Sequence, residues 1–512
     1  MRTFVVFIPA TLWLCSILPN QAHAAEESIL DKFSYRGDVV FQGFFLQRDL
    51  PLIREGVPRC ENFYFQEYTG LKTPCREEED YYRIRLRTDL LFRPSSYAEI
   101  LYGMEVGFLT FGRDDPNRTG PGSGGGGSGR VNLETRELLL RLKSKGNNHR
   151  VDLGIFSIGT PDGIVLASSG AGLRYQGRLP NINSDLELTF IKAEDNSRVD
   201  NDSNGFSDSN FSDIDMATFR WRYSGVKQVK SIIYGVFRRD GDNTAGDSGE
   251  EVREISTLYW GGILLQFSYG RWLLNINLIG NGGDFHRPHE LTVREQHLLD
   301  HNLQLATTYA DYKNNVANFV TPEIWRRYRV AAAAGYLELG LNITDNLSAV
   351  IQGAAGSGRP GVEPDGSSVE YRRDQFRTAG SGFQLSDIAV DTSGGYSLFV
   401  NGQLTGLAIG GGGLKYNIHG GLQLSLRYFH IEYYRTPVAD FNENYRLHHQ
   451  VRQNSNYVGA EWNLWLKWMV FSDLSLDLRL GWFDAGAGYK IVHDVVGGDR
   501  IFESSLAIKQ KF

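Results

Sequence analysis

The clearest chemical pattern in this chain is three arginines at alternate positions. Arg83, Arg85 and Arg87 lie in the segment YYRIRLRTDLLFR, with Ile84 and Leu86 between them. Successive side chains of a β-strand face opposite sides, so this segment as a strand would have one cationic face and one apolar face. Closely spaced guanidinium groups can attract and guide anions. A soluble β-sandwich could carry the same pattern, so the rest of the chain must decide where these arginines lie.

Alternation of apolar and polar residues recurs along the chain, for example in residues 460–468 and 474–482. Segments of about ten such residues, separated by turn residues, are typical of a transmembrane β-barrel. We therefore predict an all-β, antiparallel transmembrane barrel of about 18 strands, the first near 38–46 and the last at 502–512. An arginine that faced lipid near the bilayer centre would cost about 2–4 kcal/mol, so the three arginines should face the lumen.

The amino terminus predicts export. Arg2 is followed by an apolar run at 4–18 and by Ala22-His23-Ala24, a small-residue cleavage site, so we interpret 1–24 as a cleaved signal peptide. Residues 25–33 then form a short periplasmic segment, and 34–512 form the barrel. We expect the outer membrane of a Gram-negative bacterium, in contact with its lipid and lipopolysaccharide. Loss of Arg2 changes the formal charge from -7 to -8, which argues against a nucleic-acid partner.

Connections of two lengths orient the barrel, because short turns lie on the periplasmic side and long loops outside. We expect no plug domain, so a constriction must come from inward side chains and folded loops. Short turns are predicted at 94–96, 145–148, 344–346 and 472–473, and long loops near 50–79, 112–132, 193–213, 282–301, 357–395 and 436–455.

The polar faces of the predicted strands supply candidate pore-lining residues. They carry carboxylates as well as cations, so two interpretations remain open. The cations form an anion-selective path, or the charges neutralise one another across neighbouring strands. The candidate residues that bind a passing solute are Arg83, Arg85, Arg87, Arg141, Arg220, Arg222, Arg427, Lys467 and Arg479.

Three stretches resemble the alginate-export porins: the segment that begins RELLLRLKSKGNNHRVDLG at Arg136, GYLELGLNITDNLSAVIQGAAG from Gly335, and VGAEWNLWLKWMVFSDLSLDLRLGWF from Val458. The resemblance implies an 18-stranded pore with a cationic constriction that passes an anionic exopolysaccharide outward. It also implies periplasmic scaffold proteins of a synthesis-export complex as partners, and it adds Arg174 to the pore-lining candidates. The outer loops do not match that family, and Trp465 falls on the lumen side.

We therefore expect a channel for passive export of an anionic, alginate-like exopolysaccharide. One alternative is a substrate-selective or general porin that imports small anions or oligosaccharides. Another is a surface-exposed binding or adhesive barrel. We expect no cofactor and no enzymatic activity, because no nucleophile motif or phosphate-binding loop is found.

Two further groups of residues lie in the expected outer loops. Cys60 and Cys75 are the cysteines left after signal removal, and the oxidising compartment predicts a disulfide between them. Four oxygen-bearing residues could form a weak calcium loop, but Phe211 stands where the motif needs its last carboxylate. A solvated acidic loop is the favoured interpretation of that group, Asp200, Asp202, Asn204 and Asp208.

Overall fold

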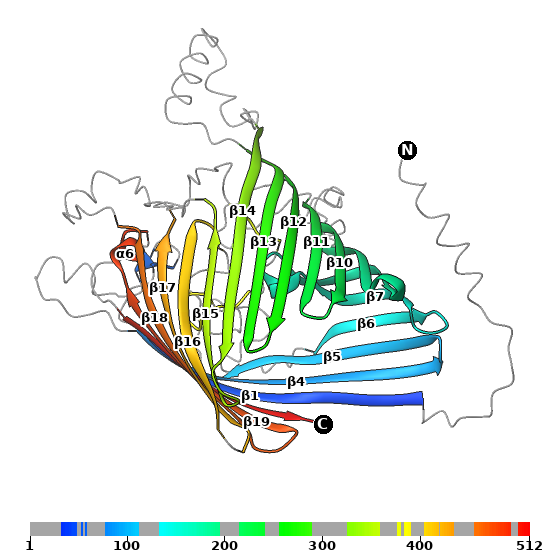
Figure 1. Ribbon diagram of the computed structural model, residues 1–512, viewed down its shortest axis with the longest axis horizontal. Coiled ribbons are helices and arrows are strands. Elements are labelled where there is room, and N and C mark those ends of the chain that lie inside the picture. Colours follow the sequence, from blue (N-terminus) through cyan, green and yellow to red (C-terminus); the bar gives the residue numbers. More distant parts are fainter. Residues whose placement is uncertain are drawn as a thin grey trace, which may run out of the picture.

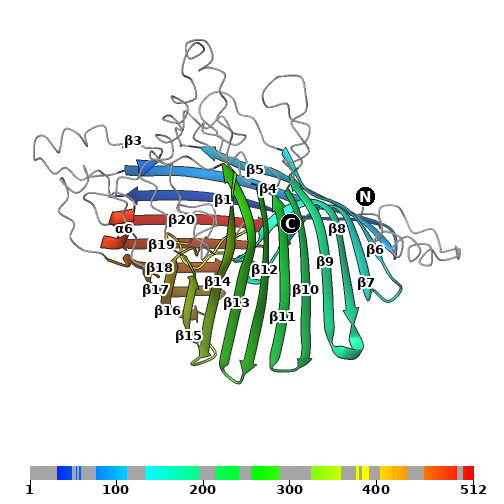
Figure 2. The same cartoon turned by 90° about the horizontal axis from the view of Figure 1, so that it is seen from above.

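Eighteen strands form one closed antiparallel sheet, as the alternation predicts. The structure, a computed structural model, describes residues 32–48, 53–54, 57–58, 77–111, 133–194, 214–240, 255–288, 325–358, 376–379, 383–390, 404–418, 420–434, 455–492 and 500–512. Figures 1 and 2 show the strands side by side around the wall. The barrel strands are β1 (Phe33–Arg48), β4 (Glu77–Ser95), β5 (Ala98–Phe111), β6 (Leu133–Lys143), β7 (His149–Gly159), β8 (Ala167–Leu179), β9 (Ser184–Glu194), β10 (Ile214–Val226), β11 (Val229–Asp240), β12 (Ile255–Tyr269), β13 (Trp272–Pro288), β14 (Trp325–Asn342), β15 (Leu347–Gly356), β16 (Leu407–Ile418), β17 (Leu422–Tyr433), β18 (Tyr457–Met469), β19 (Leu474–Ala485) and β20 (Arg500–Lys511).

Short elements complete the described part of the chain. They are the strand pair β2 (Ile53–Arg54) and β3 (Val57–Pro58), the 3-10 turns η2 (Pro161–Gly163) and η3 (Pro180–Ile182), and the helix α6 (Ala487–Val492). No helix in the described ranges is long and apolar enough to cross a membrane.

The first and last strands close the barrel. β1 pairs with β4 on one side and with β20 on the other, and Figure 2 shows β1 and β20 as blue and red neighbours. At the seam, the backbone N–H of Gly37 donates to the carbonyl of Phe512 at 3.0 Å, and the N–H of Phe512 donates back at 3.1 Å. A Cβ atom at residue 37 would clash with the backbone carbonyl oxygen of Arg87 and with the Phe512 ring, so only glycine fits there without a shift. Closure leaves no unpaired sheet edge.

The outer surface of the wall is apolar. Leu278, Ile351 and Phe190 are more than half exposed on strands whose alternate residues face inward. Lipid cannot satisfy backbone polar groups, and a closed barrel with an apolar outer band satisfies them within its own wall. The predicted fold class and the outer-membrane localisation are therefore confirmed.

Four predicted short turns are also confirmed, at the β4–β5, β6–β7, β14–β15 and β18–β19 connections. The connection from 241 to 254, between β11 and β12, was not among the predicted long loops. Several predictions lie outside the described residues: the signal peptide, the disulfide of Cys60 and Cys75, and the calcium candidate.

Candidate functional site: the charged lumen and its inward segments

The arginines of β4 face the lumen, as their alternation predicts, and ion pairs connect Arg85 and Arg87 to the neighbouring strands. Arg85 Nη2 lies 3.3 Å from Asp38 Oδ1 on β1, and Arg87 Nε lies 2.5 Å from Glu105 Oε2 on β5. Glu105 is directly opposite Arg87, and Asp38 lies diagonally across from Arg85, so these side chains share one face of the sheet. Neutralisation across neighbouring strands therefore occurs here, as one of the two interpretations requires.

A larger cluster surrounds Asp152 on β7, whose side chain is fully buried. Its carboxylate lies 2.9 Å from Arg141 Nε, 3.2 Å from Arg150 Nη2 and 2.6 Å from Arg174 Nη2. Arg141 and Arg174 are predicted pore-lining residues. Arg150 and Asp152 were missed, although their alternation with Val151 and Leu153 could have placed them on the same face.

Glu99 on β5 extends this cluster and is shared by three cations. Its carboxylate lies 3.3 Å from Arg141 Nη1, 2.6 Å from Lys143 Nζ and 3.2 Å from Arg93 Nε. Together, Glu99 and Asp152 face five basic side chains. This part of the wall is therefore only partly neutralised, and it keeps a positive charge.

Two predicted residues lie nearer the short-turn end of the barrel. Arg220 on β10 lies 2.6 Å from Glu187, and Arg222 lies 2.6 Å from Asp185, both on β9. These pairs connect strands through the register that sets Arg220 opposite Glu187 and Arg222 opposite Asp185.

An aromatic platform carries two more predicted arginines on the other side of the ring. Arg427 on β17 lies 4.2 Å from the centre of the Trp465 ring, and Arg479 on β19 lies 5.4 Å from it. Arg427 also donates to Gln352 Oε1 at 3.2 Å. Cation–π contacts hold a guanidinium without cancelling its charge. Trp465, placed on the lumen side by sequence, thus supports two cations.

The two remaining predicted residues differ in their surroundings. The Arg83 guanidinium lies over the rings of Phe44 and Tyr81, at 5.0 and 4.9 Å. Lys467 on β18 is directly opposite Asp477 on β19. Both lie on the lumen face, so all ten predicted pore-lining residues occupy the inner wall, but they do not form one cluster.

A first inward segment, residues 160–166, connects β7 to β8 and crosses the lumen. Ile164, Val165 and Leu166 are fully buried. Asn277 on β13 donates to Asp162 Oδ2 at 3.2 Å and accepts from the Tyr234 hydroxyl at 2.9 Å. Strands β8 to β12 lie between β7 and β13 in the wall, so this contact spans the interior of the barrel.

A second inward segment, residues 376–379, joins the first to the wall. Trp260 Nε1 on β12 donates to the carbonyl of Arg377 at 2.7 Å, and Asn281 Oδ1 on β13 accepts from the Arg377 N–H at 3.1 Å. The Ala379 N–H donates to the carbonyl of Val165 at 2.8 Å. The two segments therefore form one structure inside the barrel.

A third inward segment, residues 383–390, is anchored by Glu461 on β18, which is fully buried. Its two carboxylate oxygens accept the backbone N–H groups of Asp387, Ile388 and Ala389 at 2.9, 2.8 and 2.9 Å. The Asn463 side chain donates to the same carboxylate at 2.7 Å. The alternation of residues 460–468 puts Glu461 on the polar face of its strand but gives no sign of this anchoring role, because the segment that it holds lies more than 70 residues earlier.

The third segment also occupies the aromatic platform. Trp465 Nε1 donates to Asp387 Oδ2, and Arg479 Nη1 lies 3.8 Å from Asp387 Oδ1. The constriction of the described barrel thus comes from inward segments and side chains, as expected from the sequence. The basic faces of β4 to β10 lie across the ring from β13 to β18, which hold the third segment and part of the first two.

Metal-ligating side chains are not grouped in the described ranges: no three His, Cys, Asp or Glu side chains there are placed to hold an ion.

No family model matches the chain, and no curated protein matches it. Weakly similar solved structures include Pseudomonas aeruginosa OccK5 (OpdH), with 12% identity over 93% of this chain and 98% of that chain and a TM-score of 0.45. The outer membrane protein OpdK of the same organism has 10% identity over 94% of this chain and 99% of that chain, and a TM-score of 0.45. Acinetobacter baumannii OccAB2 has 12% identity over 95% of this chain and 99% of that chain, and a TM-score of 0.47. Likenesses this weak do not indicate a substrate.

The expected membership in the alginate-export porin family is wrong. No model of any family matches, and these similar structures carry Occ and Opd names instead. The stretches that suggested the family are alternating strands joined by tight turns. Every large outer-membrane barrel needs such strands for the same physical reason, so the pattern identified the fold and not the family.

Proposed function

We propose that the protein is a passive channel for small anionic solutes, most simply a substrate-selective porin that admits them to the periplasm. The observation that carries the proposal is the arrangement of the lumen. Inward segments 160–166 and 376–379 cross the interior, segment 383–390 is held against β18 and β19, and the partly neutralised basic wall of β4 to β10 lies across the ring from that third segment. A solute must therefore pass close to cations, which favours anions.

Weak, exchangeable contacts suit this role. A channel must attract its solute and then release it, so several partly paired arginines serve better than one strong clamp. Glu99 and Asp152 share five basic partners, which leaves N–H groups to hydrate or contact a passing anion. We also propose contact of the apolar outer wall with membrane lipid and lipopolysaccharide.

Export of an anionic exopolysaccharide is not proposed, because that expectation and its periplasmic scaffold partners depended on the rejected family resemblance. A closed surface-exposed barrel is the remaining alternative. It predicts no steady current, which the same experiment measures.

The test is the reversal potential of single channels in a planar bilayer with a KCl gradient. Simultaneous Arg83→Gln, Arg85→Gln and Arg87→Gln substitutions should lower the ratio of chloride to potassium permeability. A unit charge is worth about 1 kcal/mol at 4 Å in water. Loss of one effective positive charge disfavours chloride and favours potassium by that energy, so the ratio should fall roughly 30-fold. The matched control is Arg271→Gln, in the turn between β12 and β13, which should leave the ratio unchanged.

An unchanged ratio in the folded triple variant would reject these arginines as the selectivity element. A cation-selective wild-type channel would reject the proposal as a whole, and a folded wild-type barrel without current would favour the closed-barrel alternative.

A further inference from the structure

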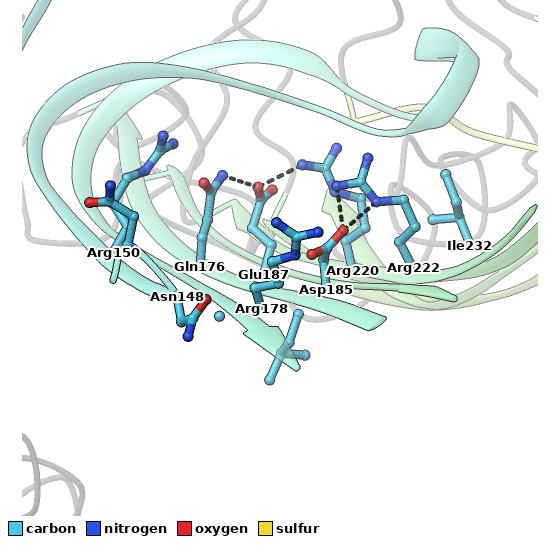
Figure 3. Close-up of a pocket in the computed structure, with 12 residues that line it drawn as sticks. Asn148, Arg150, Gln176, Arg178, Asp185, Glu187, Arg220, Arg222 and Ile232 are labelled. Carbon is cyan, nitrogen blue, oxygen red and sulfur yellow. Dashed lines mark hydrogen bonds and ion pairs between the residues drawn. The ribbon is translucent and has the colours of Figure 1, made fainter. Parts of the chain in front are cut away.

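A separate cavity of about 270 Å³ lies at the short-turn ends of β7 to β10. Figure 3 shows its charged side chains rising from neighbouring strands into the same space. It is lined by four arginines and two carboxylates: Arg150, Arg178, Arg220, Arg222, Asp185 and Glu187. Short turns mark the periplasmic end of an outer-membrane barrel, so the cavity opens where a solute would leave the channel.

The carboxylates of this cavity do not balance its cations. Glu187 is paired with Arg220, and Asp185 is paired with Arg222, each at 2.6 Å. Gln176 Nε2 also donates to Glu187 at 2.5 Å. The cavity has four guanidinium groups and two carboxylates, so it has an excess of two positive charges. This count leaves out Asp152, which lies outside the cavity and pairs with Arg150.

Arg178 contributes most of the N–H donors in the cavity that are not already bonded to a carboxylate. Its side chain is exposed, and within the described ranges its guanidinium forms no ion pair or side-chain hydrogen bond. Arg150 also lines the cavity, and it forms an ion pair with Asp152, outside the cavity, at 3.2 Å. A planar guanidinium offers several N–H donors in a geometry that matches carboxylate and phosphate oxygens.

We propose that this cavity binds a small dianion through its anionic oxygen atoms, with Arg178 as the principal unpaired contact. This inference rests on the proposed function and deepens it, because it makes the cavity an exit site that holds the solute before release. The size is consistent with such a ligand: at about 30 Å³ per water molecule, the cavity has room for roughly nine waters. A dicarboxylate and inorganic phosphate present the same oxygen chemistry, and the experiment separates them.

The experiment is single-channel current with inorganic phosphate, succinate or acetate added to one chamber and then to the other. Phosphate, succinate or both should reduce the current at lower concentration from the periplasmic side than from the other side, and acetate should act more weakly. Arg178→Gln should raise the half-blocking concentration of the dianion about tenfold, the usual effect of losing a charged hydrogen-bond partner. Arg178→Lys should restore part of the block because it keeps the charge.

Arg271→Gln is the matched control, since Arg271 lies at the same end of the barrel but outside the cavity. It should not change the block. Block by succinate alone identifies a carboxylate site, block by phosphate alone identifies a phosphate site, and block by both supports the shared chemistry.

Equal block from both sides, no preference for dianions, or unchanged block in Arg178→Gln would overturn the inference. These failures differ from failure of the proposed function. If the channel is anion-selective but the block is equal from both sides, the proposed function stands and the exit site is rejected. If the block is stronger from the periplasmic side and depends on Arg178 but the channel is not anion-selective, the exit site stands and the proposed function is rejected.

Discussion

Removal of the Glu461 carboxylate should release the third inward segment and enlarge the conducting path. The carboxylate accepts three backbone N–H groups of residues 387–389 at 2.8–2.9 Å. A net contribution of about 1–1.5 kcal/mol per hydrogen bond gives about 3–4.5 kcal/mol for the three together. Since each 1.4 kcal/mol is a factor of ten, Glu461→Ala should raise the ratio of undocked to docked segment by about 10² to 10³.

Glu461→Gln should have a smaller effect. The amide keeps one acceptor oxygen, but its nitrogen cannot accept from the N–H group that it would face. At least one hydrogen bond is lost, so the undocked population should rise about five- to tenfold.

Single-channel recording measures both effects, as a higher mean conductance and as added current noise from movement of the segment. Glu105→Gln is the matched control, because it removes a lumen carboxylate that pairs with Arg87 and accepts no hydrogen bond from the third segment among the described contacts. It should shift ion selectivity toward anions without added noise. If folded Glu461→Ala channels conduct with the wild-type amplitude and noise, the reasoning that this carboxylate fixes the segment is wrong.

Two further variants test the wall itself. Gly37→Val should impair closure, because the new side chain would clash with the backbone carbonyl of Arg87 and with the Phe512 ring at the seam. The refolding yield in detergent, measured by the mobility shift between heated and unheated samples, should therefore fall. A normal yield would contradict the argument that the strands approach too closely for a side chain at this position. Asp152→Asn should lower the free energy of unfolding by about 1–3 kcal/mol and make the channel more anion-selective, since three arginines lose their shared carboxylate. Urea titration measures the change in stability, and the reversal potential measures the change in selectivity. Unchanged selectivity would show that the cluster does not face the solute path.

The sequence alone was sufficient for the wall of the barrel. Side chains of a strand alternate between two faces, so the period of two at 83–87 and 474–482 determined which residues meet lipid and which meet the lumen. The observed strands begin and end within a few residues of expectation: β1 is Phe33–Arg48 where 38–46 was predicted, and β20 is Arg500–Lys511 where 502–512 was predicted. These features depend on neighbours along the chain, which a single sequence displays directly.

Tertiary structure decided how the lumen is filled and how its charges are paired. Glu461 meets residues 387–389, and Arg141 meets Glu99, 42 residues away, through the closure of the barrel and the register of its strands. No local period records such contacts. The same limit explains the mistaken family, since alternation reflects the demands of a bilayer on any barrel. What the lumen admits depends on the loops that fold into it, and their path is set by hydrogen bonds to distant strands.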